Sequence, residues 1–188
     1  TTDVRNNPLV GAANNWAGIA VDAERELLFV PTGSAAPDFY GGVRNGQNLY
    51  ANTLLALDAN TGSIKWHFQF THHDIWDRDP PAPPNLISVE RSGRKVPAVA
   101  QVTKQGYVYV FNRETGEPVW PIEERPVPQS DVPGEQTAPT QPFPTKPAPF
   151  EMQGMSEDHL IDFTPELRAQ ALRIANQYRM GPVFTPPS

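Results

Sequence analysis

A spaced repeat that ends in tryptophan constrains the fold of this chain more than any other feature. The first copy, A-x-D-x-x-x-G-x-x-x-W, runs from Ala56 to Trp66, and a second runs from Val110 to Trp120 with Val for Ala and Asn for Asp. In each copy the Asp or Asn side chain can cap a turn, glycine supplies a positive φ, and tryptophan can cover the gap to a neighbouring sheet. The copies start 54 positions apart, from 56 to 110, which indicates successive β-propeller blades rather than the alternative, an antiparallel β-sandwich.

A third strand-rich unit precedes the first copy. Residues 15–22 and 26–33 read as a hairpin that turns at residues 23–25. A propeller needs at least four blades of roughly 40 to 50 residues each to close, and about three are visible in 188 residues. The chain also lacks a signal peptide at its start. We therefore expect an all-β partial propeller spanning residues 1–188, which is a piece of a longer protein.

Composition narrows the possible partners and leaves the compartment open. The net charge is −6, and the 15 Lys and Arg residues are scattered, which argues against nucleic-acid binding. No apolar run approaches the roughly 18 residues needed to cross a bilayer, so any membrane anchor is expected outside this segment. The absence of cysteine is compatible with a reducing or an oxidising compartment.

The segment 118–150 breaks the strand rhythm with ten prolines, which remove backbone donors and rule out a sheet interior. A disordered linker is the ordinary interpretation of such composition. Against it, four large side chains would be costly to expose: Trp120, Ile122, Phe143 and Phe150. We expect an ordered, extended insertion that lies over the propeller face.

A helix is predicted at about residues 164–180, where Thr164 can cap the start and Pro165 suits the first turn. We expect one helix packed on the surface through four residues at helical spacing: Leu167, Ala171, Ile174 and Tyr178. Its basic residues are interpreted as a solvated face, with a docking surface as the alternative: Arg168, Arg173 and Arg179.

Residues 71–79, with the sequence THHDIWDRD, carry more ionisable side chains than a turn needs. Oxidation of an alcohol by hydride loss requires a base within hydrogen-bond reach of the hydroxyl group. Asp74, Asp77 and Asp79 are all candidates by chemistry alone, and a turn cap is the ordinary alternative for each.

Seven motifs resemble, in order and spacing, the pyrroloquinoline-quinone (PQQ)-dependent glucose dehydrogenases of the membrane-bound type. They are NNWA (14–17), FVPTG (29–33), LLALD (54–58), HHDIWD (72–77), TKQG (103–106), TQPF (140–143) and FTPPS (184–188). The resemblance runs through nearly all of the chain but covers only a central part of the family's eight-bladed propeller. It implies PQQ with Ca²⁺ or Mg²⁺, a sugar or polyol substrate, a membrane quinone as electron acceptor, and a place on the periplasmic face of the inner membrane.

The resemblance also implies roles for three residues. Asp77 takes the position of the catalytic base, and the family's Trp-Asp pair ranks it above the other two aspartates. Lys104 takes the position of the cation that hydrogen-bonds the quinone oxygens, where its charge would stabilise a developing oxyanion. Trp16 takes the position of the tryptophan beneath the planar cofactor. Taken without the resemblance, Lys104 is an exposed loop cation and Trp16 is a core residue.

Other positions leave the metal ligands unassigned. Adjacent histidines on a strand point to opposite sides and rarely share an ion, so His72 and His73 are assigned to pocket shape and to the orientation of Asp77. The alcohol-oxidising branch has an asparagine ligand where this chain has Ser34, and the glucose branch has a threonine where it has Ala36. At these two positions the chain therefore departs from the metal and cofactor contacts of the family.

Two classes of function therefore remain. The first is a quinoprotein dehydrogenase that oxidises a sugar or polyol, with glucose, quinate and glycerol among the possible substrates. The second is a non-catalytic propeller that serves as a scaffold for protein assembly, and a decayed dehydrogenase homologue is a third possibility. Asp77 and Lys104 distinguish them, because a scaffold has no reason to keep a base and a cation at that separation.

Overall fold

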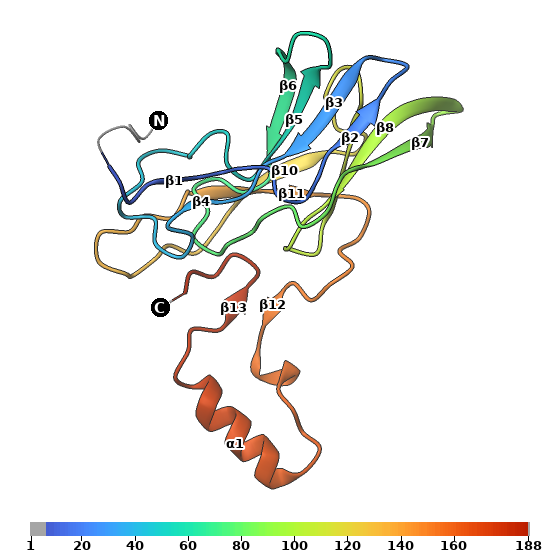
Figure 1. Cartoon of the computed structure of the whole chain (residues 1–188). Coiled ribbons are helices and arrows are strands. Elements are labelled where there is room, and N and C mark those ends of the chain that lie inside the picture. Colours follow the sequence, from blue (N-terminus) through green and yellow to red (C-terminus); the bar gives the residue numbers. More distant parts are fainter. Residues whose placement is uncertain (1–6, 188) are drawn as a thin grey trace.

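The computed structural model describes residues 7–187, and these form antiparallel β-sheets with one projecting arm (Figure 1). The first large sheet has the strand order β2 (Ala20–Asp22), β3 (Leu27–Pro31), β5 (Thr53–Asp58) and β6 (Ile64–Gln69). Strands β2 and β3 are the hairpin expected from residues 15–33, and β3 pairs directly with β5. This hairpin and the first repeat copy therefore form one four-stranded propeller blade.

The second large sheet has the order β7 (Asn85–Arg91), β8 (Arg94–Val102) and β9 (Val108–Asn112). Residues 117–119 continue it irregularly, because Val119 N–H donates to Val110 O over 2.8 Å and Asn112 N–H donates to Glu117 O over 2.8 Å. The second repeat copy thus closes the second blade as the first copy closes the first.

Three short strand pairs complete the sheet structure. They are β1 (Gly11–Ala12) with β4 (Ala35–Ala36), β10 (Ile122–Pro126) with β11 (Thr140–Pro144), and β12 (Gly154–Met155) with β13 (Gly181–Pro182). The predicted all-β partial propeller is confirmed, but residues 7–187 form two blades rather than about three, because the hairpin at residues 20–31 pairs with the first repeat copy in one sheet.

The turns of the two repeat copies have the expected capping. Asp58 Oδ1 accepts hydrogen bonds from the backbone N–H groups of Asn60 (3.0 Å) and Thr61 (2.9 Å). A hydrogen bond from Lys65, together with these turn contacts, lowers the pKa of Asp58 to about 2. The second turn has the same design around Asn112. The capping side chain thus sets each turn locally, before any tertiary contact is made.

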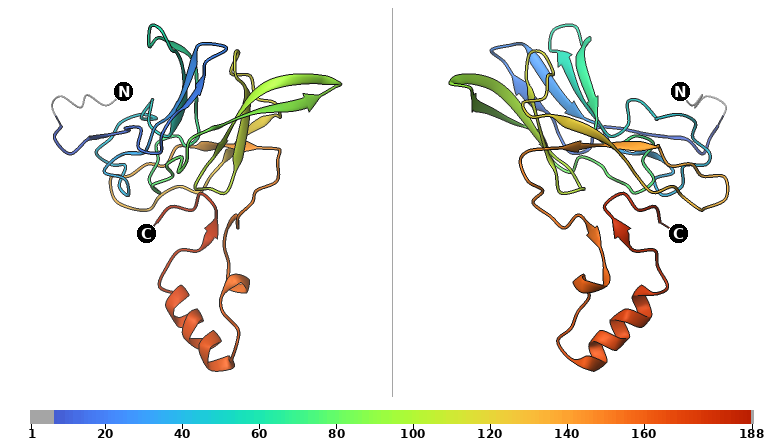
Figure 2. Two further views of the ribbon diagram at one scale, coloured as in Figure 1. Left: turned by 45° about the vertical axis from the view of Figure 1, so that its right-hand side comes forward. Right: turned by 180° about the vertical axis from the view of Figure 1, so that it is seen from behind.

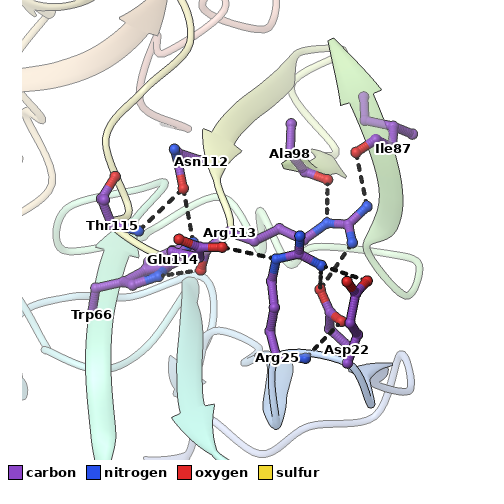
Figure 3. A network of polar contacts seen from close by, with 10 residues as sticks. Asp22, Arg25, Trp66, Ile87, Ala98, Asn112, Arg113, Glu114 and Thr115 are labelled. Carbon is purple, nitrogen blue, oxygen red and sulfur yellow. Dashed lines mark hydrogen bonds and ion pairs between the residues drawn. The ribbon is translucent and has the colours of Figure 1, made fainter. Parts of the chain in front are cut away.

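Trp66 joins the two blades. Its indole Nε1 donates to Arg113 O over 2.8 Å, and its ring packs against Phe29 and Phe111 at centroid distances of 5.8 and 5.7 Å. Figure 3 shows the indole beneath the turn of the second repeat copy. Next to it, Arg113 donates to Asp22 Oδ2 over 2.9 Å. The tryptophan therefore covers the gap between neighbouring blades, as the repeat predicted.

Gly116 is the position where this joint leaves no room for a side chain. Its φ is +74°, and an added β-carbon would lie 2.7 Å from the Trp66 ring. We expect Gly116→Ala to destabilise the folded protein by about 2 kcal/mol or more, since left-handed backbone strain adds to the steric clash. Urea unfolding measures the change. Gly62→Ala is the matched control, because Gly62 has φ +72° in the first copy and open space around it. Equal losses for the two variants would show that Trp66 does not restrict position 116.

The main core lies where the two blades meet. Its largest fully buried side chains are aromatic, among them Phe29, Phe70, Tyr109 and Phe111. Phe70 and Tyr109 come from different blades and approach to 4.9 Å between ring centroids. The loop of residues 71–79, which follows Phe70 directly, therefore starts from this aromatic junction.

The proline-rich segment is ordered, as expected, and it also forms the β10–β11 hairpin, which the sequence did not suggest. A two-stranded sheet has only edge strands, and proline is tolerated there. Phe143 of β11 packs against Tyr107 and Phe184 at centroid distances of 5.9 and 5.4 Å. This hydrophobic contact holds the hairpin against the propeller body.

The arm between β12 and β13 carries a short 3₁₀ turn (Glu157–His159) and the helix α1 (Pro165–Ala175), and it projects away from the sheets (Figures 1 and 2). Thr164 caps the helix by accepting from Leu167 N–H over 3.3 Å. The helix is shorter than the predicted 164–180, and its expected packing is not observed. Of residues 165–175, Ala175 alone is buried. The apolar face of the helix is therefore largely exposed instead of packed on the propeller surface. No helix within residues 7–187 has the length and apolar character to span a bilayer.

Candidate active site

The segment 71–79 links the two blades, and side chains from distant segments hold it in place. Gln141 of β11 accepts from the His72 N–H over 2.8 Å and donates to the His72 carbonyl over 2.7 Å. Gln105 donates to Thr71 Oγ1 over 2.6 Å. Both glutamines are buried, so the loop begins in a fixed position.

Asp74 organises the middle of this loop. Its carboxylate accepts hydrogen bonds from the backbone N–H groups of Trp76 (2.9 Å) and Arg78 (2.6 Å), and from the side chains of Ser34 (2.6 Å) and Asn52 (2.7 Å). The residue is almost completely buried. Asp74 thus acts as a structural cap, and it holds the backbone on both sides of Asp77.

Asp77 and Lys104, two of the residues singled out by sequence, lie together. Lys104 Nζ is 3.0 Å from Asp77 Oδ2 and 3.4 Å from Asp79 Oδ2. The Asp77 side chain is 32% exposed and that of Asp79 is 13% exposed. Asp77 has φ +58°, a conformation that aspartate and asparagine tolerate better than most residues. The backbone at this position turns the carboxylate towards Lys104.

Trp16 lies beside this cluster. Lys104 Nζ is 5.9 Å from the centroid of the indole ring, and Trp16 is 52% exposed, so the interpretation of Trp16 as a core residue is wrong. A β-carbon added at Gly33 would lie 2.9 Å from Asp79 Oδ1 and 3.2 Å from Trp16 Nε1. The absence of a side chain at Gly33 therefore leaves room for both the indole and the carboxylate. The exposed indole ring of Trp16 thus lies next to the Lys104 ammonium group.

The three charged groups shift one another's pKa. Burial raises the pKa of Asp77; the hydrogen bond from Lys104 opposes this rise, and the negative charge of Asp79 adds to it. Burial alone would raise the pKa of Asp79, but bonds from Ser34 and Lys104 bring it below its ordinary value. Burial would lower the pKa of Lys104, yet the two carboxylates raise it. Asp77 is thus the more basic of the two carboxylates.

The two histidines of this loop form hydrogen bonds with other segments of the chain. His72 uses Nδ1 with Gln69 Oε1 (3.0 Å) and Nε2 with Glu124 Oε1 (2.9 Å), while His73 Nδ1 bonds Gly46 O (2.5 Å). These imidazole hydrogen bonds tie the loop to neighbouring segments, and none of them goes to Asp77. A direct hydrogen bond from either imidazole to Asp77 is thus not among these contacts, and a role of the histidines in orienting Asp77 stays a prediction.

Ser34, which stands where the alcohol-oxidising branch has an asparagine, stabilises the loop of residues 71–79. Its hydroxyl donates to Asp74, and its backbone N–H donates to Asp79 Oδ1. Within residues 7–187, no group of three or more His, Cys, Asp or Glu side chains is arranged to hold a metal ion.

Sequence reasoning missed two contributors to this site. Asn52, which donates to Asp74, lies in no recognised motif. Gln141 belongs to a motif that was noted for its resemblance alone, and its clamp on His72 spans 69 positions of the chain. Only a pairing of distant segments could have revealed either contact.

Antiparallel blades joined by a tryptophan, with a lysine–carboxylate cluster formed by the loop between the blades and by the β8–β9 turn, define part of a β-propeller with a candidate active site. A family model described as "PQQ: Glucose/ethanol/alcohol dehydrogenase, beta-propeller domain" matches residues 2–188. The chain therefore belongs to this family of PQQ-dependent dehydrogenase propellers.

Individual relatives agree with this assignment. Quinoprotein glucose dehydrogenase A of Acinetobacter calcoaceticus is 44% identical over 132 residues, which cover 69% of this chain and 16% of the relative. The glycerol dehydrogenase large subunit of Gluconobacter thailandicus is 40% identical over 120 residues, covering 63% and 16%. The crystal structure of quinohemoprotein alcohol dehydrogenase from Comamonas testosteroni gives a TM-score of 0.56 at 29% identity, covering 71% of this chain and 20% of that one. The chain thus spans about one sixth of the length of the curated relatives it matches.

Proposed function

We propose that this chain is part of a PQQ-dependent dehydrogenase that oxidises a hydroxyl group of a sugar or polyol. The observation that carries the proposal is the contact of Lys104 with Asp77 over 3.0 Å, beside the exposed ring of Trp16. A base, a cation and a flat aromatic surface within one loop cluster are what such an oxidation requires. We further propose that the electrons pass to a membrane quinone on the periplasmic face of the inner membrane.

The residues present fit a planar, polyanionic quinone. Trp16 would lie against its ring system, and the missing side chain at Gly33 keeps that space open. Lys104 would hold the quinone oxygens with its ammonium group. When bound, PQQ supplies the acceptor for the hydride that leaves the substrate carbon. The ligands of the family's Ca²⁺ or Mg²⁺ stay unassigned among residues 7–187.

Asp77 is proposed as the base that takes the proton of the substrate hydroxyl. Its two rivals are less suited, because Asp74 is buried with four hydrogen bonds and Asp79 is held by Ser34 and Lys104. Asp77 is the most exposed of the three, and burial raises its pKa. A raised pKa strengthens a carboxylate as a proton acceptor.

The substrate class is proposed from the relatives, whose names include glucose and glycerol dehydrogenases. The decisive test uses the full-length protein and dye-linked oxidation of a panel of sugars, polyols and simple alcohols. The assay is run with and without PQQ, and with Ca²⁺ or Mg²⁺. Activity with sugars or polyols that requires PQQ supports the proposal and names the substrate. A well-folded protein that neither binds PQQ nor oxidises any member of the panel would favour the scaffold or the decayed homologue.

Trp16→Ala tests the proposed cofactor surface. We expect the dissociation constant of PQQ to rise by about tenfold or more, because the variant loses an aromatic stacking surface worth about 1.4 kcal/mol. Equilibrium dialysis of the full-length protein measures the affinity. Trp16→Phe is the matched control and should retain most of the affinity, since it keeps a flat ring. If alanine and phenylalanine behave alike, Trp16 does not form the cofactor surface.

A further inference from the structure

Lys104 is shared between two carboxylates, although a single partner would suffice to form an ion pair. Its Nζ lies 3.0 Å from Asp77 Oδ2 and 3.4 Å from Asp79 Oδ2. An ammonium group has three N–H donors and can serve both oxygens at once. The three groups together carry one surplus negative charge. The surplus can reside on whichever carboxylate is bound less firmly.

Asp79 is the more firmly held of the two. Its Oδ1 accepts from the backbone N–H of Ser34, and its Oδ2 faces Lys104. Its side chain is 13% exposed, against 32% for Asp77. A β-carbon added at Gly33 would lie 2.9 Å from Asp79 Oδ1, so glycine leaves the room that this carboxylate occupies. Both oxygens of Asp79 are therefore engaged, one with the main chain and the other with the lysine.

The other polar groups around this cluster are engaged elsewhere. Asp74 is occupied by Ser34 and by backbone N–H groups of its own loop. The guanidinium of Arg78 donates to Lys104 O over 3.3 Å and to Val183 O over 3.0 Å. The position of the Lys104 ammonium is thus set by Trp16 and by the two carboxylates.

We propose that Asp79 is a positioning residue, which anchors the Lys104 ammonium so that Asp77 shares the lysine instead of forming an exclusive ion pair with it. This inference rests on the proposed function. In consequence, Asp77 keeps more of its negative charge available for the hydroxyl proton, and Lys104 stays fixed where a quinone oxygen would meet it. The direction of the pKa shifts agrees, since Asp79 raises the pKa of both Asp77 and Lys104.

The first test needs no cofactor and no activity. Competitive acetylation of the full-length apoprotein, followed by mass spectrometry, reports the pH at which each lysine loses its proton. In Asp79→Asn we expect Lys104 to be acetylated about three- to tenfold faster at a fixed pH below its pKa, because one anionic partner is gone. Exposed Lys146 serves as the internal reference, and its rate should not change. Asp79→Glu keeps the negative charge, and its Lys104 should react at close to the wild-type rate.

The second test uses the PQQ-loaded enzyme and the pH dependence of kcat/KM. Removing the charge of Asp79 lowers the pKa of Asp77, so the acidic limb of the profile should move to lower pH in Asp79→Asn. The plateau should fall as well, since Asp77 becomes a weaker base. A purely structural role of Asp79 would lower the plateau without moving the limb. Asp131→Asn makes the same chemical change at a side chain that is 69% exposed and should alter neither.

The outcomes separate this inference from the proposed function. An active wild-type enzyme whose acetylation rate and acidic limb are unchanged in Asp79→Asn would overturn the positioning role while leaving the dehydrogenase intact. A wild-type protein without activity, in which Asp79→Asn still accelerates acetylation of Lys104, would support the contact and overturn the proposed function. Should Asp79→Asn fail to fold, Asp79→Glu decides, because a large change in its Lys104 acetylation contradicts the proposal.

Discussion

Asp77→Asn is expected to lower kcat for oxidation of the substrate hydroxyl group by a factor of about 10² to 10⁴, the usual loss when a general base is removed. The amide has nearly the same shape but cannot take up the proton. Asparagine also tolerates the left-handed backbone at this position, where φ is +58°, so the fold should survive. The measurement is dye-linked oxidation by the full-length protein with saturating PQQ and metal.

The controls for this variant separate chemistry from binding. Asp131→Asn should keep wild-type activity, because its side chain is 69% exposed and its ion-pair partner is Arg179 rather than Lys104. PQQ affinity should persist in Asp77→Asn, since Trp16 is unchanged and Asp79 still holds Lys104. If Asp77→Asn retains more than about a tenth of wild-type kcat, Asp77 is not the base, and Asp79 becomes the next candidate to test.

Phe111→Ala is expected to destabilise the full-length protein by about 3 to 5 kcal/mol, the typical cost of removing a buried aromatic ring. Phe111 is completely buried and packs against Phe68 at 4.9 Å and Trp66 at 5.7 Å between ring centroids. Its removal leaves a cavity at the junction of the two blades. The measurement is the shift of the urea midpoint at constant m-value.

The matched control for the core is Phe163→Ala, which deletes the same ring at a side chain that is 83% exposed. We expect a change within about 0.5 kcal/mol, as for most surface substitutions. Similar losses for Phe111→Ala and Phe163→Ala would mean either that the blade junction does not dominate stability or that the arm is buried in the complete protein.

Local features of the chain could be predicted because their causes lie within a few residues. The turn at Asp58 is set by its own side chain and by the N–H groups of the next few residues, and the cap at Thr164 needs only the first turn of its helix. The repeat predicted the position of Trp66 because its spacing already specified a blade joint. The resemblance brought Asp77, Lys104 and Trp16 into one proposed site, and the structure places them close together.

The rest depends on contacts between distant segments. The bond of Lys104 to Asp79 spans 25 positions, and that of Ser34 to Asp79 spans 45. Nothing in either short motif specifies such a pairing. The projecting arm differs from expectation for a related reason, since helical periodicity shows which face is apolar but not what it packs against.

The proline-rich hairpin restrains the motion of the loop at residues 71–79 through one side chain, Gln141. Gln141 binds both the N–H and the carbonyl of His72, as an adjacent strand would. Each proline restricts the unfolded chain, so ordering this segment costs less conformational entropy than its few backbone bonds would suggest. Local opening of the loop must break the Gln141 contacts, which couples its fluctuations to those of the hairpin. A segment whose composition suggests a linker thereby restrains the loop and limits local opening around Asp77.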